Sequence, residues 1–147
     1  MRTGVIWLGI IFSIWMQLRF KCFRPTTANS LFNLVLIYNR GMSFGLFNGG
    51  GGLNALMFSL FAAAIVTVLI YWLSRVESLL LAIAIGLIIG GAIGNVIDRI
   101  RWGAVVDFLD FHVGTWHWPA FNVADSAICI GVAMMLLDGL LLRREAH

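Results

Sequence analysis

The chain has 147 residues, of which 61% are hydrophobic and only 12% are charged. A water-soluble protein of this size needs more polar residues to cover its surface, so the composition excludes a soluble globule and indicates a membrane protein. The formal net charge of +3 is small and its charges are scattered, which argues against nucleic-acid binding and makes membrane lipids the expected partners.

Four runs are apolar enough to cross a bilayer, which takes about 20 mostly apolar residues in a helix. Because lipid offers no hydrogen-bond partners, such runs are expected to be helical. The expected transmembrane helices comprise roughly residues 3–20, 53–73, 78–97 and 124–142. The first is not followed by a small-residue cleavage site, so we expect it to remain as an anchor. The sequence therefore predicts an all-α membrane protein in which residues 1–147 form a single integral membrane domain.

Two longer loops, residues 19–52 and 98–125, emerge on one side of the membrane, and both termini lie on the other. The first loop contains an alternating segment, residues 34–38, that predicts a short strand. We expect a small extended structure there, lying at the membrane surface. Basic residues normally favour the cytoplasmic side, yet six of the ten Lys and Arg residues fall on the long-loop side. The charge count alone therefore places the long loops in the cytoplasm.

Glycines recur every four residues in the third apolar run, at Gly86, Gly90 and Gly94. A strip of such small residues lets a neighbouring transmembrane helix approach closely. The strip predicts a helix-packing seam that leads toward the polar end of this run.

All five aspartates lie in the last third of the chain, beside or within apolar runs, where an ionisable side chain is costly and often functional. Two carboxyls held within a few ångström cannot both ionise, so one retains a proton near neutral pH, as in aspartic proteases. The ionised partner then activates a water, and the protonated partner supports the oxyanion and supplies the leaving amine. Spacing alone leaves the pair open among Asp98, Asp107, Asp110 and Asp125. Asp138 is expected near the opposite interface as a helix-end residue.

Three short blocks of the sequence occur in a characteristic order between residues 39 and 126. They are Asn39-Arg40-Gly41-Met42-Ser43-Phe44-Gly45, then Gly90-Gly91-Ala92-Ile93-Gly94-Asn95-Val96-Ile97-Asp98-Arg99, then Val105-Val106-Asp107-Phe108 with Phe121-Asn122-Val123-Ala124-Asp125-Ser126. These blocks resemble those of the prolipoprotein signal peptidase (signal peptidase II) family. The resemblance implies that Asp107 and Asp125 are the catalytic pair. It implies substrate-binding or site-shaping roles for Asn39, Gly41, Phe44, Asn95, Asp98, Arg99, Asn122 and Ala124.

The resemblance also implies an activity and a location. A member of this family is an intramembrane aspartyl endopeptidase that removes the signal peptide from a diacylglyceryl-modified prolipoprotein, just before the lipidated cysteine. It needs no metal and no cofactor, and a monomer is expected. The implied location is the bacterial inner membrane, with both termini cytoplasmic. An extended periplasmic cradle follows the first helix, and the active site lies near the periplasmic surface.

One departure from the family pattern keeps other readings open. Family members usually carry Asp-Gln-x-x-Lys at the end of the first helix, whereas this chain has Met16-Gln17 with Lys21 displaced by one position. One alternative is an inactive relative that binds lipidated precursors without cleaving them. Another is a small channel or transporter subunit, with its aspartates along an ion path. The clustering of the carboxylates at one end of otherwise apolar spans favours the protease over the channel.

Overall fold

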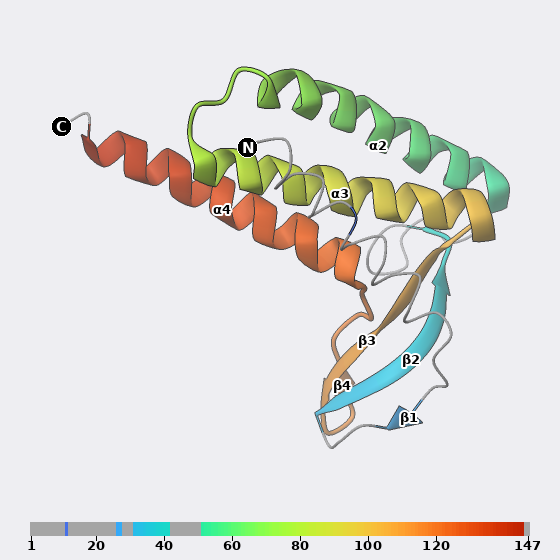
Figure 1. Cartoon of the computed structure of the whole chain (residues 1–147). Coiled ribbons are helices and arrows are strands. Elements are labelled where there is room, and N and C mark those ends of the chain that lie inside the picture. The colour runs from blue at the N-terminus through green and yellow to red at the C-terminus, as the bar shows by residue number, and fades with distance from the viewer. Residues whose placement is uncertain (1–10, 12–25, 28–30, 42–50, 146–147) are drawn as a thin grey trace.

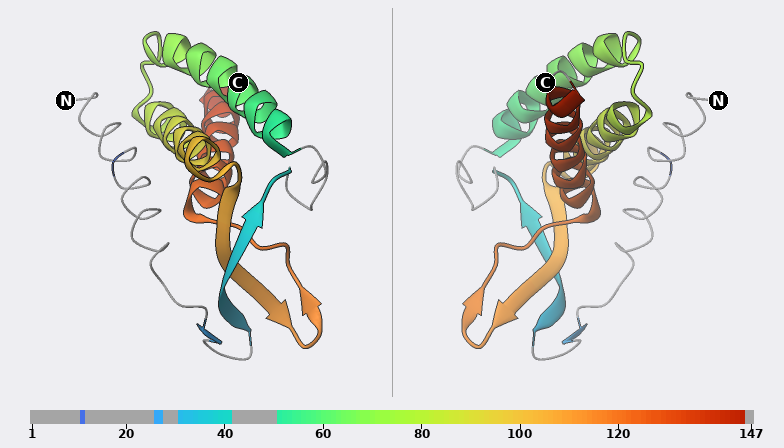
Figure 2. Two further views of the ribbon diagram at one scale, coloured as in Figure 1. Left: turned by 90° about the vertical axis from the view of Figure 1, so that its right-hand side faces the viewer. Right: turned by 90° about the vertical axis from the view of Figure 1, so that its left-hand side faces the viewer.

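The computed structural model describes residues 11, 26–27, 31–41 and 51–145 (Figure 1). Their helices are α2 (Gly51–Leu73), α3 (Leu79–Trp102) and α4 (Val123–Glu145), and their strands are β1 (Thr26–Thr27), β2 (Phe32–Asn39), β3 (Val105–Val113) and β4 (Trp116–His117). Helix α3 packs against both α2 and α4, and the sheet projects from the end of the bundle where α3 ends and α4 begins (Figures 1 and 2).

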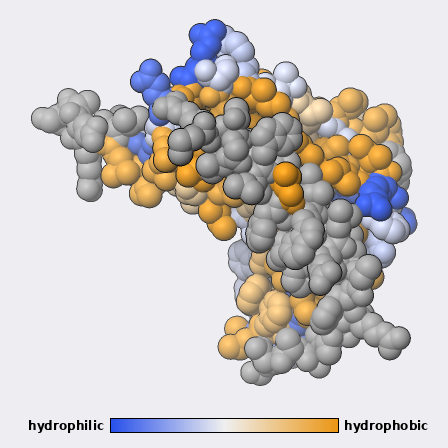
Figure 3. Space-filling view, in the orientation of Figure 1, coloured by the Kyte–Doolittle hydropathy of each residue, from blue (hydrophilic) through white to orange (hydrophobic). Residues whose placement is uncertain are grey.

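Three helices in the described part of the chain are long and apolar enough to span a membrane: Leu53–Leu73, Leu79–Trp102 and Val123–Leu141. They fall on the second, third and fourth runs expected from the sequence. The first expected span, residues 3–20, lies outside the described residues apart from Ile11. In the space-filling view, the coloured residues of the helical part are mostly hydrophobic, and hydrophilic residues gather toward its ends (Figure 3). This is the surface that a bilayer requires.

Helix α3 is the central element of the bundle. Of its most apolar 18-residue stretch, 61% is buried, against 17% for α2 and for α4. Helix α3 also continues to Trp102, five residues past the expected end. Asp98 therefore lies inside the helix, whereas the sequence predicted that it begins the following loop. The helix ends at Gly103, whose φ of 66° is left-handed and whose N–H donates to Arg99 O at 2.9 Å. Arg99 and Arg101 suit the last turn because they face the negative end of the helix dipole.

Glycines outside the predicted strip bring α3 and α4 into close contact. Gly86, Gly90 and Gly94 are all buried in α3. The closest approach is at Gly91, where an added Cβ would overlap the carbonyl of Ala124. On α4, a Cβ at Gly131 would lie 2.6 Å from Ala84 O of α3. The two backbones therefore meet with no room for side chains between them.

The end of the bundle opposite the sheet is closed by a polar contact between α3 and α4. Ser78 caps α3 by accepting a hydrogen bond from Leu81 N at 3.3 Å. The Ser78 hydroxyl donates to Asp138 Oδ1 at 2.6 Å, and Asp138 is buried. Asp138 thus lies at the end of the bundle that the sequence suggested, but seven residues before the last residue of α4, joining the two helices.

An antiparallel sheet, with strand order β1-β2-β3-β4 in the described residues, is larger than the small extended structure that the sequence predicted beside the helices. The alternating segment at residues 34–38 does form a strand, β2, as expected. Strand β3, however, occupies the stretch that the sequence interpretation left as a loop between residues 98 and 125. Its Val and Phe residues favour a strand, but two aspartates interrupt the apolar alternation by which a strand is recognised.

A β-bulge divides the β2–β3 pairing into two registers. Leu34 and Ile37 are three residues apart, yet they pair with Leu109 and Asp107, which are two apart. Strand β2 therefore contains one extra residue between these positions. Because side chains alternate between the two faces of a sheet, the extra residue reverses which β2 side chains point to which face.

The α3–α4 contact gives a stability prediction. Changing Gly91 to Ala places a methyl group where the Ala124 carbonyl and the Ile128 side chain already lie, so the helices must separate. We expect a loss of about 1–3 kcal/mol in stability, as for other overpacked interiors. Thermal unfolding of the purified protein in detergent measures it. The matched control is Gly139→Ala on α4, where an added Cβ meets nothing within 4 Å. Equal unfolding temperatures for the two variants would contradict the close packing.

Candidate active site

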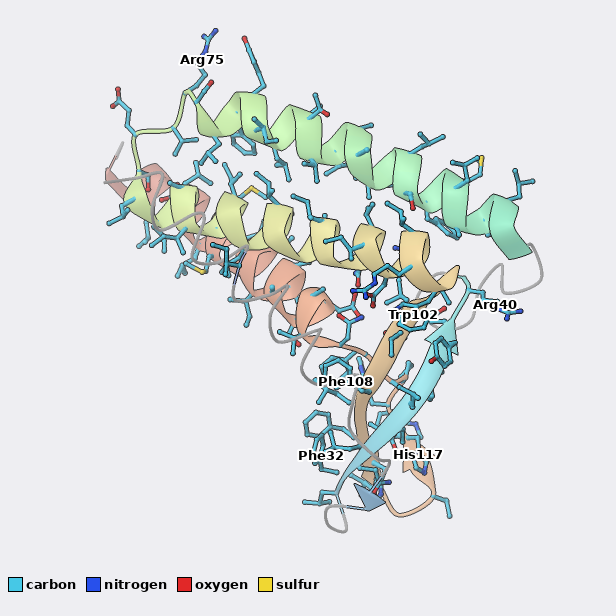
Figure 4. The ribbon with its side chains drawn as sticks, turned by 45° about the vertical axis from the view of Figure 1, so that its right-hand side comes forward. Phe32, Arg40, Arg75, Trp102, Phe108 and His117 are labelled. Atoms are coloured by element: carbon cyan, nitrogen blue, oxygen red, sulfur yellow. The ribbon has the colours of Figure 1, made fainter. Side chains whose placement is uncertain are left out.

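The residues singled out from the sequence converge where the sheet joins the helices. Asn95, Asp98 and Arg99 lie in the last two turns of α3, Asp107 on β3, Asn39 at the end of β2 with Gly41 just beyond, and Ala124 and Asp125 in the first turn of α4 with Asn122 just before it. Figure 4 shows this junction, with Arg40 and Trp102 beside it, Phe32 and His117 farther out on the sheet, and Arg75 at the other end of the bundle. Phe44, which the resemblance also assigns to the site, lies outside the described residues.

A cavity of about 460 Å³ opens at this junction. Six of the expected site residues line it: Asn39, Gly41, Asn95, Arg99, Asp107 and Asp125. Asp98, Asn122 and Ala124 do not line it and are fully buried in the structure around it. The cavity therefore has two carboxyls, two amides and one guanidinium on its wall.

Asn122 caps α4, and Asp125 completes the cap. The Asn122 Oδ1 atom accepts hydrogen bonds from Ala124 N at 2.7 Å and from Asp125 N at 3.1 Å. In return, the Asn122 backbone N–H donates to Asp125 Oδ2 at 3.2 Å. This reciprocal pattern is a capping box, which satisfies N–H groups that the first turn of a helix leaves without partners. Asp125 is therefore fixed by the same hydrogen bonds that start the helix.

The amide of Asn122 also connects this cap to the strand. Its Nδ2 atom donates to Asp107 Oδ1 at 3.0 Å and to Asn95 Oδ1 at 3.2 Å. Asn95 in turn donates from Nδ2 to Asp125 Oδ1 at 2.8 Å. A closed circuit of hydrogen bonds thus links the two aspartates, and Asn122 touches both of them.

Each oxygen of the two carboxyls accepts one amide hydrogen bond. Asp107 accepts from Asn122 on Oδ1 and from Asn39 on Oδ2, the latter at 3.1 Å. Asp125 accepts from Asn95 on Oδ1 and from the Asn122 backbone on Oδ2. These donors are neutral, so they orient the carboxyls without supplying a countercharge. Each oxygen keeps a second lone pair that can serve water or substrate.

The β-bulge explains how Asn39 reaches Asp107. Asn33 and Asn39 are six residues apart, so in a regular strand they would lie on the same face. Asp107 and Asp110 are three apart on β3 and lie on opposite faces. Yet Asn33 donates to Asp110 at 3.2 Å while Asn39 donates to Asp107. Both pairs form because the bulge between Asn33 and Asn39 reverses the side-chain alternation.

The electrostatics of the site make Asp107 easier to protonate than a carboxyl in water. Burial, followed by the negative charge of Asp125, raises the pKa of Asp107 to about 6, even though the hydrogen bonds from Asn39 and Asn122 act in the opposite direction. The guanidinium of Arg99 lines the same cavity. It donates to Asn95 O at 3.3 Å and lies over the Phe58 ring of α2, 5.5 Å from its centroid.

The other two candidate aspartates are engaged elsewhere. Asp98 accepts a hydrogen bond from Val106 N at 3.2 Å. Asp110 is buried on the opposite face of β3, where its carboxyl contacts Asn33 and His117 Nδ1. Burial alone would raise the pKa of Asp110, but the hydrogen bonds from His117 and Asn33 outweigh it and lower the pKa. Of the four candidates, the structure brings Asp107 and Asp125 together at the cavity.

Several residues that line the cavity were not identified from the sequence. They are Val105 on β3, Trp118, Pro119, Ala120 and Phe121 in the segment between β4 and α4, and Ser126, Cys129 and Ile130 on α4. The α4 residues could have been found, because Cys129 lies four residues after Asp125 and shares its helix face. The segment before α4 carries no such periodicity, so only its fold brings it to the cavity.

Comparison with known proteins gives a consistent result. The family described as Signal peptidase (SPase) II matches residues 3–141. The lipoprotein signal peptidase of Paraburkholderia phymatum is 52% identical over 110 residues, and those of Burkholderia mallei and Burkholderia thailandensis are 50% identical over the same length. Each match covers 74% of this chain and 66% of the relative, so the chain spans slightly under two thirds of these proteins.

The fold is also similar to solved structures. Two bacterial membrane enzymes determined by the in meso method, at 2.3 and 1.9 Å resolution, superpose with TM-scores of 0.77 and 0.75. Both are 26% identical in sequence and cover 95% of this chain, which in turn covers 87% and 92% of their length. With a family match over nearly its whole length, the chain belongs to the signal peptidase II family.

Proposed function

We propose that this protein is an aspartyl endopeptidase of the membrane, which removes the signal peptide from diacylglyceryl-modified prolipoproteins just before the lipidated cysteine. The observation that carries the proposal is the pair Asp107 and Asp125, joined through Asn122 at one cavity. The names of the relatives, lipoprotein signal peptidases, support the substrate class. Lipidated prolipoproteins and membrane lipids are the proposed partners.

In the proposed reaction Asp125 is the ionised base and Asp107 the protonated acid. Asp125 lies at the N-terminus of α4, where the helix dipole favours a negative charge. The pKa of Asp107, raised to about 6, supports proton retention on that side. Asp125 takes a proton from a water, and the resulting hydroxide attacks the scissile carbonyl. Asp107 donates a hydrogen bond to the developing oxyanion. When the C–N bond breaks, the leaving amine takes up a proton from the pair.

The amides and the guanidinium on the cavity wall have a positioning role in this proposal. Asn39, Asn95 and Asn122 hold the two carboxyls in one orientation before the substrate arrives. Such preorganised dipoles cost no rearrangement during the reaction. Arg99 provides donors for the substrate backbone beside the pair. Gly41 and Ala124 place no bulky side chain near the pair. Phe44 is assigned to substrate contact on the resemblance alone.

We further propose a specific arrangement in the membrane. Residues 1–147 form one domain with four transmembrane helices, the first being residues 3–20. The protein lies in the bacterial inner membrane as a monomer, with both termini cytoplasmic and the cavity near the periplasmic surface. The cavity lies at the end of the bundle from which the sheet projects, which supports a site at a membrane surface. The contrary count of basic residues is weakened because Arg99, one of the six, lines the cavity.

The two alternatives make different demands on the structure. A channel needs carboxylates along a path through the membrane, whereas Asp107 and Asp125 lie together at one end of the bundle. An inactive relative would share the whole arrangement, and the Met16 departure that suggests it lies outside the described residues. Only a cleavage assay separates this relative from a protease.

That assay compares single substitutions in the purified protein, with a diacylglyceryl-modified precursor and its unlipidated form as substrates. Asp107→Asn and Asp125→Asn are each expected to lower the cleavage rate by about 10²–10⁴-fold, because each removes a group that transfers a proton. Asp110→Asn is the matched control, since that carboxyl faces away from the cavity. Wild-type protein should cleave only the lipidated precursor, and a zinc chelator should have no effect.

Other results would reject parts of this proposal. Cleavage that survives both Asp→Asn changes would exclude the aspartyl mechanism. A wild-type protein that binds the lipidated precursor without cutting it would be the inactive relative, and inhibition by the chelator alone would indicate a metalloenzyme.

The hydrogen bonds to Asp107 give a pH prediction. Asn39 donates to Asp107 and stabilises its ionised form, which lowers its pKa. Asn39→Ala should therefore raise the pKa of Asp107 above about 6. Because the acid partner must be protonated, the alkaline limb of the pH–rate profile should move to higher pH. The control Asn33→Ala, on the same strand but bonded to Asp110, should leave that limb in place. Identical limbs in all three proteins would show that this hydrogen bond is not made in solution.

A further inference from the structure

Asp98 is a buried carboxylate beside the cavity that the proposed reaction does not use. Its side chain is fully buried in the next-to-last turn of α3, and it does not line the cavity. A carboxylate removed from water is costly unless polar partners hold it. Its position therefore calls for a function other than contact with substrate.

The geometry connects Asp98 to the strand that carries Asp107. Asp98 Oδ2 accepts a hydrogen bond from Val106 N at 3.2 Å, across the turn at Gly103 that ends α3. Val106 immediately precedes Asp107 and is itself 2% exposed. Residues 98 and 106 belong to different elements, so this hydrogen bond sets where β3 begins relative to the last turn of α3. It fixes the backbone one residue before the proposed acid.

We propose that Asp98 is a positioning residue for Asp107, which it holds through the Val106 amide and toward which it directs a negative charge. The inference rests on the proposed function, in which Asp107 is the acid. Asp98 touches neither the substrate nor the reacting atoms in this proposal; it acts through the strand and through the electric field at the cavity.

The charge of Asp98 has an effect separate from its hydrogen bond. Charged groups from two elements face Asp107: Asp125 from α4, and Asp98 and Arg99 from α3. After burial and the charge of Asp125, the charge of Asp98 also helps to raise the pKa of Asp107. Asp98 thus favours retention of a proton on the acid partner, in the direction opposite to the hydrogen bond from Asn39.

Two substitutions separate these effects. Asp98→Asn removes the charge but keeps a carbonyl oxygen that can accept from Val106 N. Asp98→Ala removes both. The alkaline limb of the pH–rate profile should move to lower pH in both variants, because the pKa of Asp107 falls without the nearby negative charge. Below that limb, kcat should fall less in Asp98→Asn, which keeps the hydrogen bond, than in Asp98→Ala. In Asp98→Ala it should fall by about 10²-fold, the cost of a misplaced catalytic group, while KM changes little.

Amide hydrogen exchange at Val106 tests the geometry without any assay of activity. Exchange should be faster in Asp98→Ala than in wild type, and unchanged in Asp98→Asn. The control is Asp138→Asn, which neutralises another buried helix carboxylate, at the far end of the bundle. It should alter neither the pH limb nor the Val106 amide, whatever it does to global stability.

The outcomes are distinct. An alkaline limb that does not move in Asp98→Asn would overturn the electrostatic part of the proposal, and unchanged Val106 exchange in Asp98→Ala would overturn the positioning part. If wild-type protein fails to cleave the lipidated precursor, the proposed function fails. A spectroscopic titration of Asp107 in wild type and Asp98→Asn, together with the Val106 exchange, then still decides the role of Asp98. If Asp98→Ala does not fold, Asp98→Ser replaces it, because the serine hydroxyl is too short to reach the amide and this variant should behave as Asp98→Ala.

Discussion

The site depends on one helix cap. Asn122 begins α4 through its side-chain oxygen, and its amide nitrogen reaches Asp107 on β3. Its backbone N–H holds Asp125, so a single fully buried residue joins the start of a transmembrane helix, a strand and both carboxyls. Helix caps are normally local devices that stabilise by roughly 1 kcal/mol. Here the cap also determines the spacing of two acids, and α4 cannot move against β3 without breaking it.

The burial of this helix start makes the cap necessary. Asn122 and Ala124 are fully buried, so the free N–H groups at the start of α4 need partners within the protein, and so does the carboxylate beside them. The capping box serves both needs. The Asp125 carboxylate accepts a hydrogen bond from Asn122 N–H, and Asp125 N–H donates to the Asn122 side chain. The negative charge of Asp125 also lies at the positive end of the helix dipole. The close contact of α3 and α4 at Gly91 brings Asn95 within reach of Asp125 and of Asn122. Packing of small residues deep in the bundle and hydrogen bonding at its end are therefore parts of one arrangement.

The sheet contributes the other half of the site through a local irregularity. Without the bulge in β2, Asn33 and Asn39 would share one face and could not reach carboxyls on opposite faces of β3. Bulges often lie next to active sites because they redirect a side chain. One side-chain hydrogen bond lies on each side of the bulge and fixes the register there. The outer one joins Asn33 to Asp110, and the inner one joins Asn39 to Asp107. Asp98, if it acts as proposed, fixes the near end of the same strand from α3.

The sequence by itself determined the class of protein and, through the family resemblance, predicted the residues of its site. Runs of about 20 apolar residues have one stable form in lipid, so the spans that became α2, α3 and α4 could be predicted from composition. Three ordered motif blocks identified the residues around the cavity. Only the tertiary structure shows which of Asp98, Asp107, Asp110 and Asp125 lie together at the cavity, because their separation in space depends on the turn at Gly103, the register of β3 and the bulge in β2. Strand β3 was not predicted from the sequence. Its two aspartates interrupt the apolar alternation that indicates a strand, yet both are buried by residues of other elements. The sequence pattern of one segment contains no information about those neighbours.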